Sequence, residues 1–378
     1  MLGAMCELFV AVGPGCARAG ETRTPRRPWQ RGGRADLRFV YGAVAIALWQ
    51  RGRTVARPEQ VASDGVLGAG QREALLVSER AHGVRVCASR MRKVAETFAG
   101  KVVLITGASS GIGAEAAQMF AERGATVVAV ARRAHLLDAV IANCRKHTPE
   151  SFFLAGDVGD RAFAESIVAT TLERLGRIDV LVNNAAISKH KHVYHTRAEE
   201  AEAVMRINFL STVWTTFAAI PAMLRQGGGN IVNVSSFAAK VTPPREALYA
   251  ASKAALSAFT EGLWHDLEGS NIHVVLVHPG PIDTEIWLKE DEPPSYRGKK
   301  YPPSIVVEAI FDCIQRRRYE VTVPQRNPML MSARFLRLAL PSVLRWGMQK
   351  ADPVPPEVLE KARARSRAGK QLGEVEED

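Results

Sequence analysis

The stretch Leu248–Leu256 places a phenol at Tyr249 and an ammonium at Lys253, with small helix-forming residues between them. Residues four positions apart lie on one face of a helix, so both side chains can face one cleft. A free tyrosine titrates at about pH 10, and a nearby ammonium lowers that pKa because it stabilises the phenolate. Such a pair can donate a proton to a carbonyl oxygen or remove one from an alcohol. The same spacing also occurs on ordinary exposed helix faces, so the acid/base interpretation needs support from the rest of the chain.

A glycine-rich stretch, TGASSGIG, begins at Thr106 and contains Gly107, Gly111 and Gly113. Glycine allows positive φ and lets a backbone approach a ligand closely. The start of a helix offers free N–H groups and the positive end of its dipole to a phosphate. A glycine turn can also be a tight turn without a ligand, but this one lies between a strand-like run and a helical run. That context predicts binding of a dinucleotide pyrophosphate.

Both candidate sites lie in a chain that alternates strands and helices from Lys101 onward. β-Branched apolar runs predict strands buried on both faces, and Gly124 closes the first helical run. The alternation predicts an α/β fold in three layers, a doubly wound Rossmann-type fold with a parallel sheet of about seven strands. The expected strands are 101–106, 126–131, 151–158, 178–186, 230–236, 272–280 and 319–324, and the expected helices are 114–124, 134–147, 161–176, 197–226 and 246–270.

The glycine spacing G-x-x-x-G-x-G resembles the classical type of short-chain dehydrogenase/reductase, over roughly residues 98–285 and more weakly to about 325. Further family motifs follow in order: GDV at 156–158, N-N-A-A at 183–186 where the family has N-N-A-G, and P-G-x-x-x-T at 279–284. The methyl group of Ala186 is expected to change the pocket shape slightly rather than prevent binding. The resemblance implies cofactor contacts from Gly107, Ser109, Ser110, Gly111, Ile112, Gly113, Arg132, Asp157, Val158, Asn184, Ala185, Tyr249, Lys253, Pro279, Gly280, Ile282 and Thr284.

The resemblance also assigns roles around the tyrosine and lysine. Ser236 precedes Tyr249 by 13 residues, as in the family, and Asn208 falls on the preceding helix. Ser236 would hydrogen-bond the substrate oxygen, and Tyr249 would be the acid/base. Lys253 would lower the pKa of the tyrosine and hold the nicotinamide ribose, and Asn208 would organise a water that links the lysine to solvent. Ser235 is the competing serine, and the spacing favours Ser236.

The second expected strand ends in V-A-R-R, which places Arg132 and Arg133 directly after it. In the family, an acidic residue in this region holds the ribose hydroxyls of NAD, and a basic residue just after the strand pairs with the 2′-phosphate of NADP. Arg132 lies where the basic residue would sit, and a charge-assisted contact contributes about 1.5–3 kcal/mol. The resemblance therefore implies NADP(H), with NAD as the less favoured cofactor. An arginine at the start of a helix can also simply be solvated.

Residues 285–303 are polar, contain proline and show no periodicity. In the family this region is the mobile substrate lid. Apolar side chains in it and on the other side of the expected site favour a hydrophobic alcohol, ketone or aldehyde over a sugar. These side chains are Phe237, Val241, Trp287, Leu288 and Tyr296.

The segment Asn327–Lys350 is apolar with interspersed basic residues. It predicts a basic amphipathic helix, interrupted at Pro341, that either lies on a membrane surface or packs on the core or on a subunit partner. Residues after about Asp352 are rich in proline and charge and are expected to be mobile. The resemblance implies a homo-oligomer, because helices flanking the sheet commonly form dimers or tetramers in the family.

Residues 1–90 differ in composition from the rest of the chain. They contain 14 Arg, no Lys and 7 acidic residues, whereas residues 91–378 hold 36 basic and 32 acidic residues. Three interpretations stay open: a natural start at Met91, a targeting segment, or a disordered extension. Since most of the excess charge lies there, no nucleic-acid partner is expected. The expected division is an extension at 1–94, a cofactor-binding domain at 95–325 and a C-terminal segment at 326–378.

The five cysteines show no paired short spacing, so neither a metal site nor a disulfide framework is expected. A reducing, cytoplasmic location follows as the simplest expectation, with peripheral membrane association as an option. The predicted function is an NADP(H)-dependent oxidoreductase that moves hydride between nicotinamide and a hydrophobic alcohol, ketone or aldehyde, with Tyr249 and Lys253 as the acid/base pair. The alternative is a membrane-associated or regulatory protein that binds the cofactor and turns over little.

Overall fold

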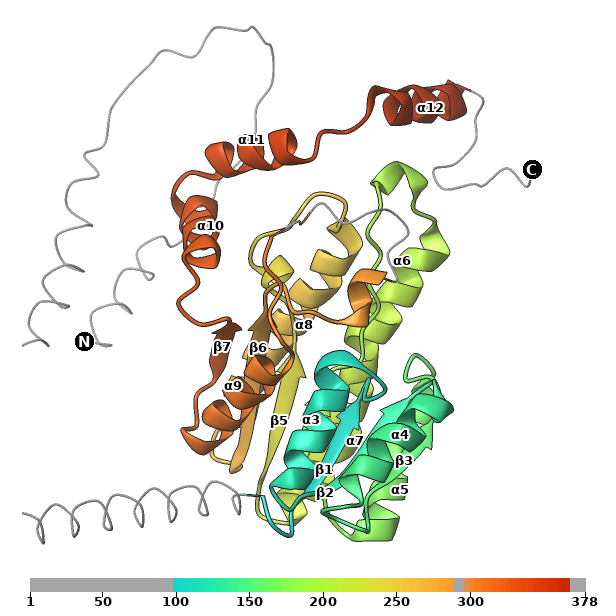
Figure 1. Cartoon of the computed structure of the whole chain (residues 1–378), viewed down its shortest axis with the longest axis vertical. Coiled ribbons are helices and arrows are strands. Elements are labelled where there is room, and N and C mark those ends of the chain that lie inside the picture. The colour runs from blue at the N-terminus through green and yellow to red at the C-terminus, as the bar shows by residue number, and fades with distance from the viewer. Residues whose placement is uncertain (1–97, 289–295, 297, 368–378) are drawn as a thin grey trace, which may run out of the picture. The chain divides into compact units, whose positions relative to one another are not determined.

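The computed structural model describes residues 98–288, 296 and 298–367, and these residues build a seven-stranded sheet (Figure 1). Every neighbouring pair of strands is parallel, in the order β3-β2-β1-β4-β5-β6-β7. The predicted doubly wound α/β fold is therefore confirmed. The strands are β1 (Val102–Thr106), β2 (Thr126–Ala131), β3 (Phe152–Ala155), β4 (Val180–Asn183), β5 (Gly229–Val234), β6 (Ile272–Pro279) and β7 (Glu320–Val323).

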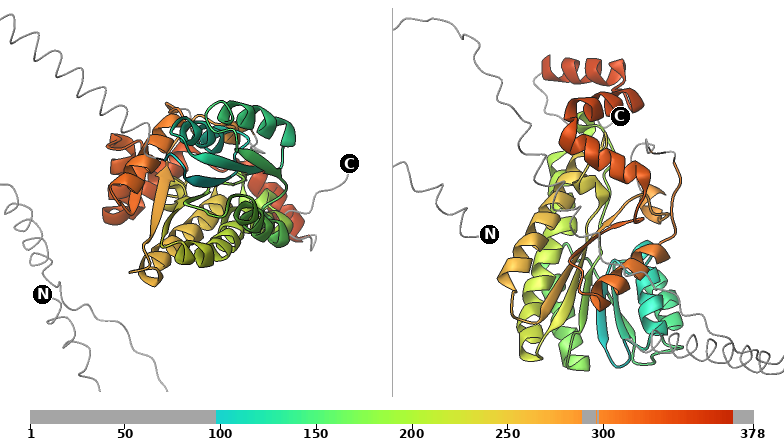
Figure 2. Two further views of the ribbon diagram at one scale, coloured as in Figure 1. Left: turned by 90° about the horizontal axis from the view of Figure 1, so that it is seen from below. Right: turned by 90° about the vertical axis from the view of Figure 1, so that its left-hand side faces the viewer.

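The central strands are apolar because helices cover both faces of the sheet. Phe120, Leu137 and Ile310 belong to the buried cluster on one face, which α3, α4 and α9 cover. The opposite cluster includes Ile167 and Met223, under α5, α7 and α8, and Figure 2 shows the two helix layers on either side of the sheet. The helices are α3 (Gly111–Glu122), α4 (Ala134–Cys144), α5 (Arg161–Leu175), α6 (Ala198–Met205), α7 (Ser211–Arg225), α8 (Ala247–Asp266) and α9 (Ser304–Gln315).

Two features of the helices differ from the sequence expectations. Helix α9 was not predicted, although its buried Val306, Val307, Ile310 and Phe311 carry a helical period. The expected helix 197–226 is divided by a π-helical segment, Arg206–Leu210, between α6 and α7. The run Ala198–Arg225 is long and apolar enough to cross a membrane, but it packs against α5 and α8 in this domain.

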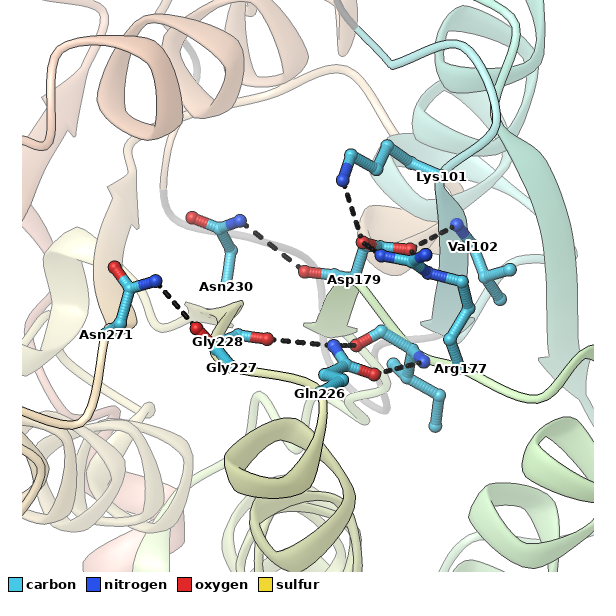
Figure 3. Close-up of polar contacts among 10 residues, drawn as sticks. Lys101, Val102, Arg177, Asp179, Gln226, Gly227, Gly228, Asn230 and Asn271 are labelled. Atoms are coloured by element: carbon cyan, nitrogen blue, oxygen red, sulfur yellow. Dashed lines mark hydrogen bonds and ion pairs between the residues drawn. The ribbon is translucent and has the colours of Figure 1, made fainter.

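Asp179, the residue before β4, connects the N-terminal ends of β1 and β4 (Figure 3). Its carboxylate accepts from the Lys101 ammonium at 3.1 Å, from both nitrogens of Arg177 that face it at 2.6 and 2.7 Å, and from the Val102 N–H at 3.0 Å. Burial alone would raise the pKa of Asp179, but these donors lower it below its usual range. Asp179 thus joins β1 to β4 at the edge opposite to the glycine turn, and it takes no part in the candidate site.

The C-terminal helices α10 (Pro328–Ala339) and α11 (Pro341–Ala351) follow β7, and the break between them lies at Leu340 and Pro341 (Figure 1). Leu330 is the buried residue of α10 and packs over Gly280, the residue after β6. The tail expected to be mobile contains a helix, α12 (Pro356–Arg367), because a proline start is followed by Glu, Leu, Lys, Ala and Arg, which favour helix. The expectations for residues 1–94, 289–295 and 368–378 lie outside the described residues.

Candidate active site

The direction of strand order changes at β1, because β2 and β3 extend the sheet to one side and β4 to β7 to the other. In open parallel sheets, ligands bind at the carboxyl ends of the strands at such a point. A cleft of about 380 Å³ lies there, between segments that follow β1, β2, β3 and β4. The predicted cofactor residues that line it are Gly107, Ser109, Ser110, Gly111, Ile112, Arg132, Asp157, Val158, Asn184, Ala185 and Thr284.

The glycine turn has a shape that side chains would prevent. Gly107 and Gly111 have φ of +69° and +56°, in the left-handed region. A Cβ on Gly113 would lie 2.3 Å from the main-chain oxygen of Gly107, so this close approach of helix and turn requires glycine. Ser110, the N-cap of α3, makes no side-chain capping bond, which leaves the first N–H groups of α3 accessible to an anion.

Asn184, after β4, holds the glycine turn in place. Its amide nitrogen donates to the main-chain oxygens of Thr106 at 3.1 Å and Gly107 at 3.3 Å. The buried hydroxyl of Thr106 in turn accepts from the N–H groups of Asn184 and Ala185 at 3.0 and 3.1 Å. Thr106 was not singled out from the sequence, yet it joins β1 to the N-N-A-A motif by its side chain.

Two arginines lie at one end of the cleft, and the structure separates their partners. Arg132, predicted to read the phosphate, has Nη1 at 3.8 Å from Oδ2 of Asp157, and both side chains are about half exposed. Arg133 donates from Nη2 to the hydroxyls of Ser109 at 3.0 Å and Ser110 at 2.8 Å, and from Nη1 to Glu285 at 2.8 Å. Arg133, which the sequence analysis left without a role, is therefore the arginine that reaches the glycine turn.

Six predicted cofactor residues do not line the cleft. Two of them, Tyr249 and Lys253, lie on α8 and are described below, and the other four shape the surroundings of the cleft. Gly113 packs on the turn, and Pro279 ends the fully buried strand β6. Gly280 donates its N–H to the Val323 oxygen at 2.6 Å, and Ile282 is buried in the core. Their direct contact with a cofactor stays a prediction.

The two serines after β5 have different environments. Ser235 is buried, and its hydroxyl donates to the Lys253 main-chain oxygen at 2.9 Å. Ser236 is half-buried and caps the short 3₁₀ turn Phe237–Ala239, where its Oγ accepts from the Ala238 N–H at 3.1 Å. Ser236 is thus the more accessible hydroxyl, and its own proton is not used by this capping bond.

Tyr249 and Lys253 lie one turn apart in α8, with the tyrosine half-buried and the lysine 2% exposed. The lysine Nζ lies 6.0 Å from the centre of the tyrosine ring and donates to the Val234 oxygen at 2.8 Å. Burial lowers the pKa of Lys253 to about 7. At neutral pH this lysine is therefore poised between its charged and neutral forms, beside a partly accessible phenol.

Asn208 is fully buried in the π-helical segment, and its side chain joins two parts of the site. Oδ1 accepts from the Ile187 N–H at 2.8 Å. Nδ2 donates to the Ile187 oxygen at 2.9 Å and to the Ser252 hydroxyl at 3.0 Å. Both amide hydrogens are therefore engaged, and the side chain connects the segment after β4 with the helix of Tyr249.

The apolar residues expected on the substrate side are not all together. Trp287 donates from Nε1 to the Ile282 oxygen at 2.6 Å, and this places its ring beside Ser110 and α3 rather than beside Ser236. Its neighbour is Tyr296, with ring centres 6.1 Å apart. Phe237 is half-buried and Val241 is buried, both close after Ser236 in the chain. The Leu288 side chain lies outside the described part of the structure.

A second hollow lies beside the first turn of α8, close in sequence to Tyr249. It has a volume of about 780 Å³ between the segment after β4, the segment before α8, and helix α11. Arg245 joins two of these walls, because its Nε donates to Asp352 at 2.6 Å. The apolar residues that line this hollow are Val193, Tyr194, Pro243, Pro244, Ala247, Pro341, Leu344, Met348 and Val354.

Comparison with known proteins gives a consistent assignment. A family model described as short chain dehydrogenase matches residues 101–294. A Drosophila melanogaster protein named dehydrogenase/reductase SDR family protein 7-like is 32% identical over 274 residues, which cover 68% of this chain and 82% of that protein. An uncharacterized oxidoreductase of Thermotoga maritima is 42% identical over 188 residues, 50% of this chain and 74% of its own length.

Two further similar proteins each match about half of this chain. The 11-beta-hydroxysteroid dehydrogenase 1A of Arabidopsis thaliana is 42% identical over 193 residues, 50% of this chain and 55% of the plant protein. Among solved structures, a Sinorhizobium meliloti protein assigned as a short-chain alcohol dehydrogenase is 31% identical. The match covers 51% of this chain and 76% of that one, with a TM-score of 0.49.

Proposed function

The chain belongs to the short-chain dehydrogenase family of oxidoreductases, and on that premise we propose that it interconverts apolar alcohols and carbonyl compounds with NADP(H). The observation that carries the proposal is the pair on α8, a half-buried Tyr249 one turn from a buried Lys253. Burial alone would make this lysine a poor choice for a structural helix position, because it removes a charge from water. A role in adjusting the acidity of the phenol gives it a purpose.

The cleft at the carboxyl ends of the strands fits a nicotinamide dinucleotide. The open first turn of α3 and Ser109 and Ser110 would hold the pyrophosphate, Asp157 the adenine, and Thr284 the nicotinamide end. When bound, the cofactor supplies or accepts a hydride at its nicotinamide ring.

The chain's own residues manage the substrate oxygen and its proton. The Ser236 hydroxyl accepts from Ala238 and keeps its own proton for a carbonyl oxygen. Tyr249 donates a proton to the same oxygen in reduction and removes it in oxidation. The ammonium form of Lys253 stabilises the phenolate that remains. Both side-chain amide hydrogens of Asn208 are already engaged. A water that links Lys253 to solvent would therefore bind the main-chain oxygen of Asn208, in the π-helical segment.

The substrate class follows from the hollow beside the first turn of α8. Ala247, two residues before Tyr249, lies in its lining, and half of the eighteen lining residues are apolar. Phe237 and Val241 add apolar surface after Ser236. A hydrophobic alcohol, ketone or aldehyde would bury its apolar part there, whereas a sugar would lose hydrogen bonds to water. The Arabidopsis relative is named for a hydroxysteroid, an apolar alcohol, which agrees with this class.

The preference for NADP(H) is tested by changing the two arginines at the end of the cleft. Arg132→Ala and Arg133→Ala are each expected to raise the NADPH dissociation constant by about tenfold, because each removes a charge-assisted contact to the 2′-phosphate. NADH binding should change by less than about twofold, since NADH lacks that phosphate. Fluorescence titration of the full chain with both cofactors measures the effect.

Arg161→Ala is the matched control, because Arg161 is an exposed arginine on α5 that pairs with Glu165. It should leave both dissociation constants unchanged. Equal affinity of the wild-type chain for NADH and NADPH would refute the preference. A loss of NADPH affinity in Arg133→Ala alone would move the reading of the phosphate from Arg132 to Arg133.

We also propose peripheral membrane contact through α10 and α11. Met331, Phe335, Leu338 and Trp346 on these helices are 58% to 78% exposed. Exposed apolar side chains of this size with basic neighbours suit the interface of an anionic bilayer. The basic neighbours are Arg334, Arg337, Arg345 and Lys350.

Co-sedimentation with vesicles of phosphatidylcholine and phosphatidylserine tests this contact. The full chain is expected to bind them, and binding should fall by about tenfold or more in Phe335→Glu/Trp346→Glu, because both changes place a carboxylate in the apolar face. Gln349→Glu is the matched control, because Gln349 is exposed on α11 and the change adds a carboxylate without removing an apolar group. It should leave binding to the vesicles unchanged. The proposal would be overturned if the full chain did not bind the vesicles. If, in addition, sedimentation velocity showed dimers that the double change dissociates, a second copy of the chain would cover this face.

A further inference from the structure

Ser236 and the 3₁₀ turn Phe237–Ala239, together called the serine turn, are held by three charged or titratable residues. The proposed reaction does not use these three residues. His278 lies near the end of β6 and is fully buried. Glu320 begins β7, the neighbouring strand, and Lys240 directly follows the 3₁₀ turn that Ser236 caps. Three segments distant in sequence therefore meet beneath Ser236.

The imidazole of His278 contacts an oxygen through each of its nitrogens. Nδ1 lies 3.1 Å from the main-chain oxygen of Ser236, and Nε2 lies 3.2 Å from Oε1 of Glu320. A carbonyl oxygen only accepts, so the Nδ1 that bonds it carries a hydrogen. The carboxylate also only accepts, and although the Nε2 contact is not aligned as a hydrogen bond, the charges attract when Nε2 is protonated as well.

Glu320 supplies the counter-charge and a second attachment for the same turn. The Lys240 ammonium lies 2.7 Å from Oε1 of Glu320. The contact with His278 lowers the pKa of Glu320, burial opposes this, and Lys240 adds to the lowering, which brings the pKa to about 2. Glu320 is therefore a carboxylate throughout the neutral range. It contacts His278, which bonds the start of the serine turn, and Lys240, which follows its end.

These contacts set where the Ser236 hydroxyl points. The main-chain oxygen of Ser236 is held by His278 on one side of the residue, and its Oγ is held by the Ala238 N–H on the other. A shift of the main chain at Ser236 would carry the hydroxyl away from the substrate oxygen. Misplacement of a reacting group by about 1 Å can cost a large factor in rate.

We propose that His278, supported by Glu320 and Lys240, is a positioning residue that holds Ser236 in its catalytic orientation. The proposal rests on the proposed function, because it requires Ser236 to contact the substrate oxygen. A buried histidine that only fills space in β6 would give the same burial. A side chain that keeps the Nδ1 donor but lacks the ring distinguishes the two roles. It should preserve turnover if His278 positions Ser236, and it should not if the ring only fills space.

The test compares His278→Leu with His278→Asn in NADPH-dependent reduction of 4-nitrobenzaldehyde, an apolar aldehyde. Leucine removes the donor to Ser236, and kcat is expected to fall by about tenfold or more while the NADPH dissociation constant changes by less than about twofold. The asparagine amide can place a donor near the position of Nδ1, so His278→Asn should keep kcat within about threefold of wild type.

His273→Leu is the matched control, because His273 is also a buried histidine of β6 but lies at the opposite end of the strand, against Tyr319. It should lower the thermal midpoint as His278→Leu does and leave kcat unchanged. Ser236→Ala completes the set, alone and combined with His278→Leu. If His278 acts through Ser236, the leucine change has no further effect on kcat in the Ser236→Ala background.

The results separate the role of His278 from the proposed function. Wild-type turnover that Ser236→Ala lowers and His278→Leu leaves intact overturns the role of His278 but not the function. Equal losses of kcat in His278→Leu and His278→Asn, or in the His273→Leu control, also overturn it, since ring packing would then explain them. Turnover that Ser236→Ala does not affect refutes the proposed function, and the inference with it.

Discussion

Changing Tyr249 to phenylalanine is expected to lower kcat for reduction of an apolar aldehyde by roughly 10²- to 10⁴-fold. The change removes the hydroxyl and keeps the ring, which lies 6.0 Å from the Lys253 ammonium on the same helix face. The cofactor cleft is not lined by Tyr249, so the NADPH dissociation constant should stay within about twofold of wild type. Loss of NADPH absorbance measures turnover, and fluorescence titration measures binding.

Tyr319→Phe serves as the control, because Tyr319 precedes β7 and is half exposed at the other end of the sheet. It should leave kcat unchanged. Wild-type kcat in Tyr249→Phe would contradict the acid/base role. A chain that binds NADPH tightly in both forms and reduces no carbonyl compound in either would instead support the alternative, a regulatory or membrane-associated protein that binds the cofactor.

Changing Lys253 to methionine is expected to abolish most turnover and to raise the free energy of unfolding. Burial lowers the pKa of Lys253 from 10.5 to about 7. With about 1.36 kcal/mol for each pKa unit, the fold loses on the order of 5 kcal/mol by holding the charged lysine below pH 7. Methionine removes that cost but leaves the Val234 oxygen without its 2.8 Å donor, which returns about 1–2 kcal/mol. The expected net gain is about 3 kcal/mol.

This gain depends on pH in a defined direction. The unfolded lysine keeps its proton up to its ordinary pKa of 10.5, whereas the folded one releases it near 7. Between these values the unfolded state binds more protons, so the stability of the wild-type protein rises with pH. The advantage of Lys253→Met is therefore largest below pH 7 and shrinks toward pH 10.5.

Urea unfolding at pH 6 and pH 9 measures this difference. Lys146→Met is the control, because Lys146 is exposed and bonds only Asn143 three residues away in the described contacts. It should change the free energy of unfolding little, and equally at both values. A Lys253→Met variant that is less stable than wild type at both pH values would show that the bond to Val234 outweighs the burial of charge.

The fold and the main site motifs could be predicted because their signals are local. A buried parallel strand is an apolar run, and a glycine turn between strand and helix needs only neighbouring residues to be identified. The spacing of Tyr249 and Lys253 is likewise contained in one helix. The period of α9 was equally local, with Val306, Ile310 and Phe311 on one face, and it was missed because the segment follows an irregular stretch.

The orientation of the arginines could not be predicted, because it depends on a residue far along the chain. Arg133 is drawn to the glycine turn by Ser109 and Ser110 and by Glu285, 152 positions away. Sequence spacing alone favoured Arg132. Arg132 and Arg133 differ because the segment after β6 brings Glu285 close to the end of β2, where it contacts Arg133.

The support of Ser236 was hidden for the same reason. His278 and Glu320 are 42 positions apart, and they meet because β6 and β7 pair in parallel with Leu276 opposite Glu320. The π-helical segment that carries Asn208 also depends on contacts across the fold, with Ile187 and Ser252. Such buried polar contacts have no signature in a single sequence, because β6 contains two histidines and its sequence does not distinguish His278 from His273.

The proposed acid/base role is tested most directly by measuring the pKa of the Tyr249 phenol in the presence and absence of the Lys253 side chain. The measurement is an ultraviolet difference titration with saturating NADP, in which the tyrosinate signal of Tyr249→Phe is subtracted from that of the wild-type chain. We expect a phenolate that forms at least about one pH unit below the ordinary value of about 10, and a midpoint that returns to about 10 or higher in Lys253→Met. A midpoint at or above 10 in the wild-type chain would contradict this role, because Lys253 would then not change what the tyrosine can do.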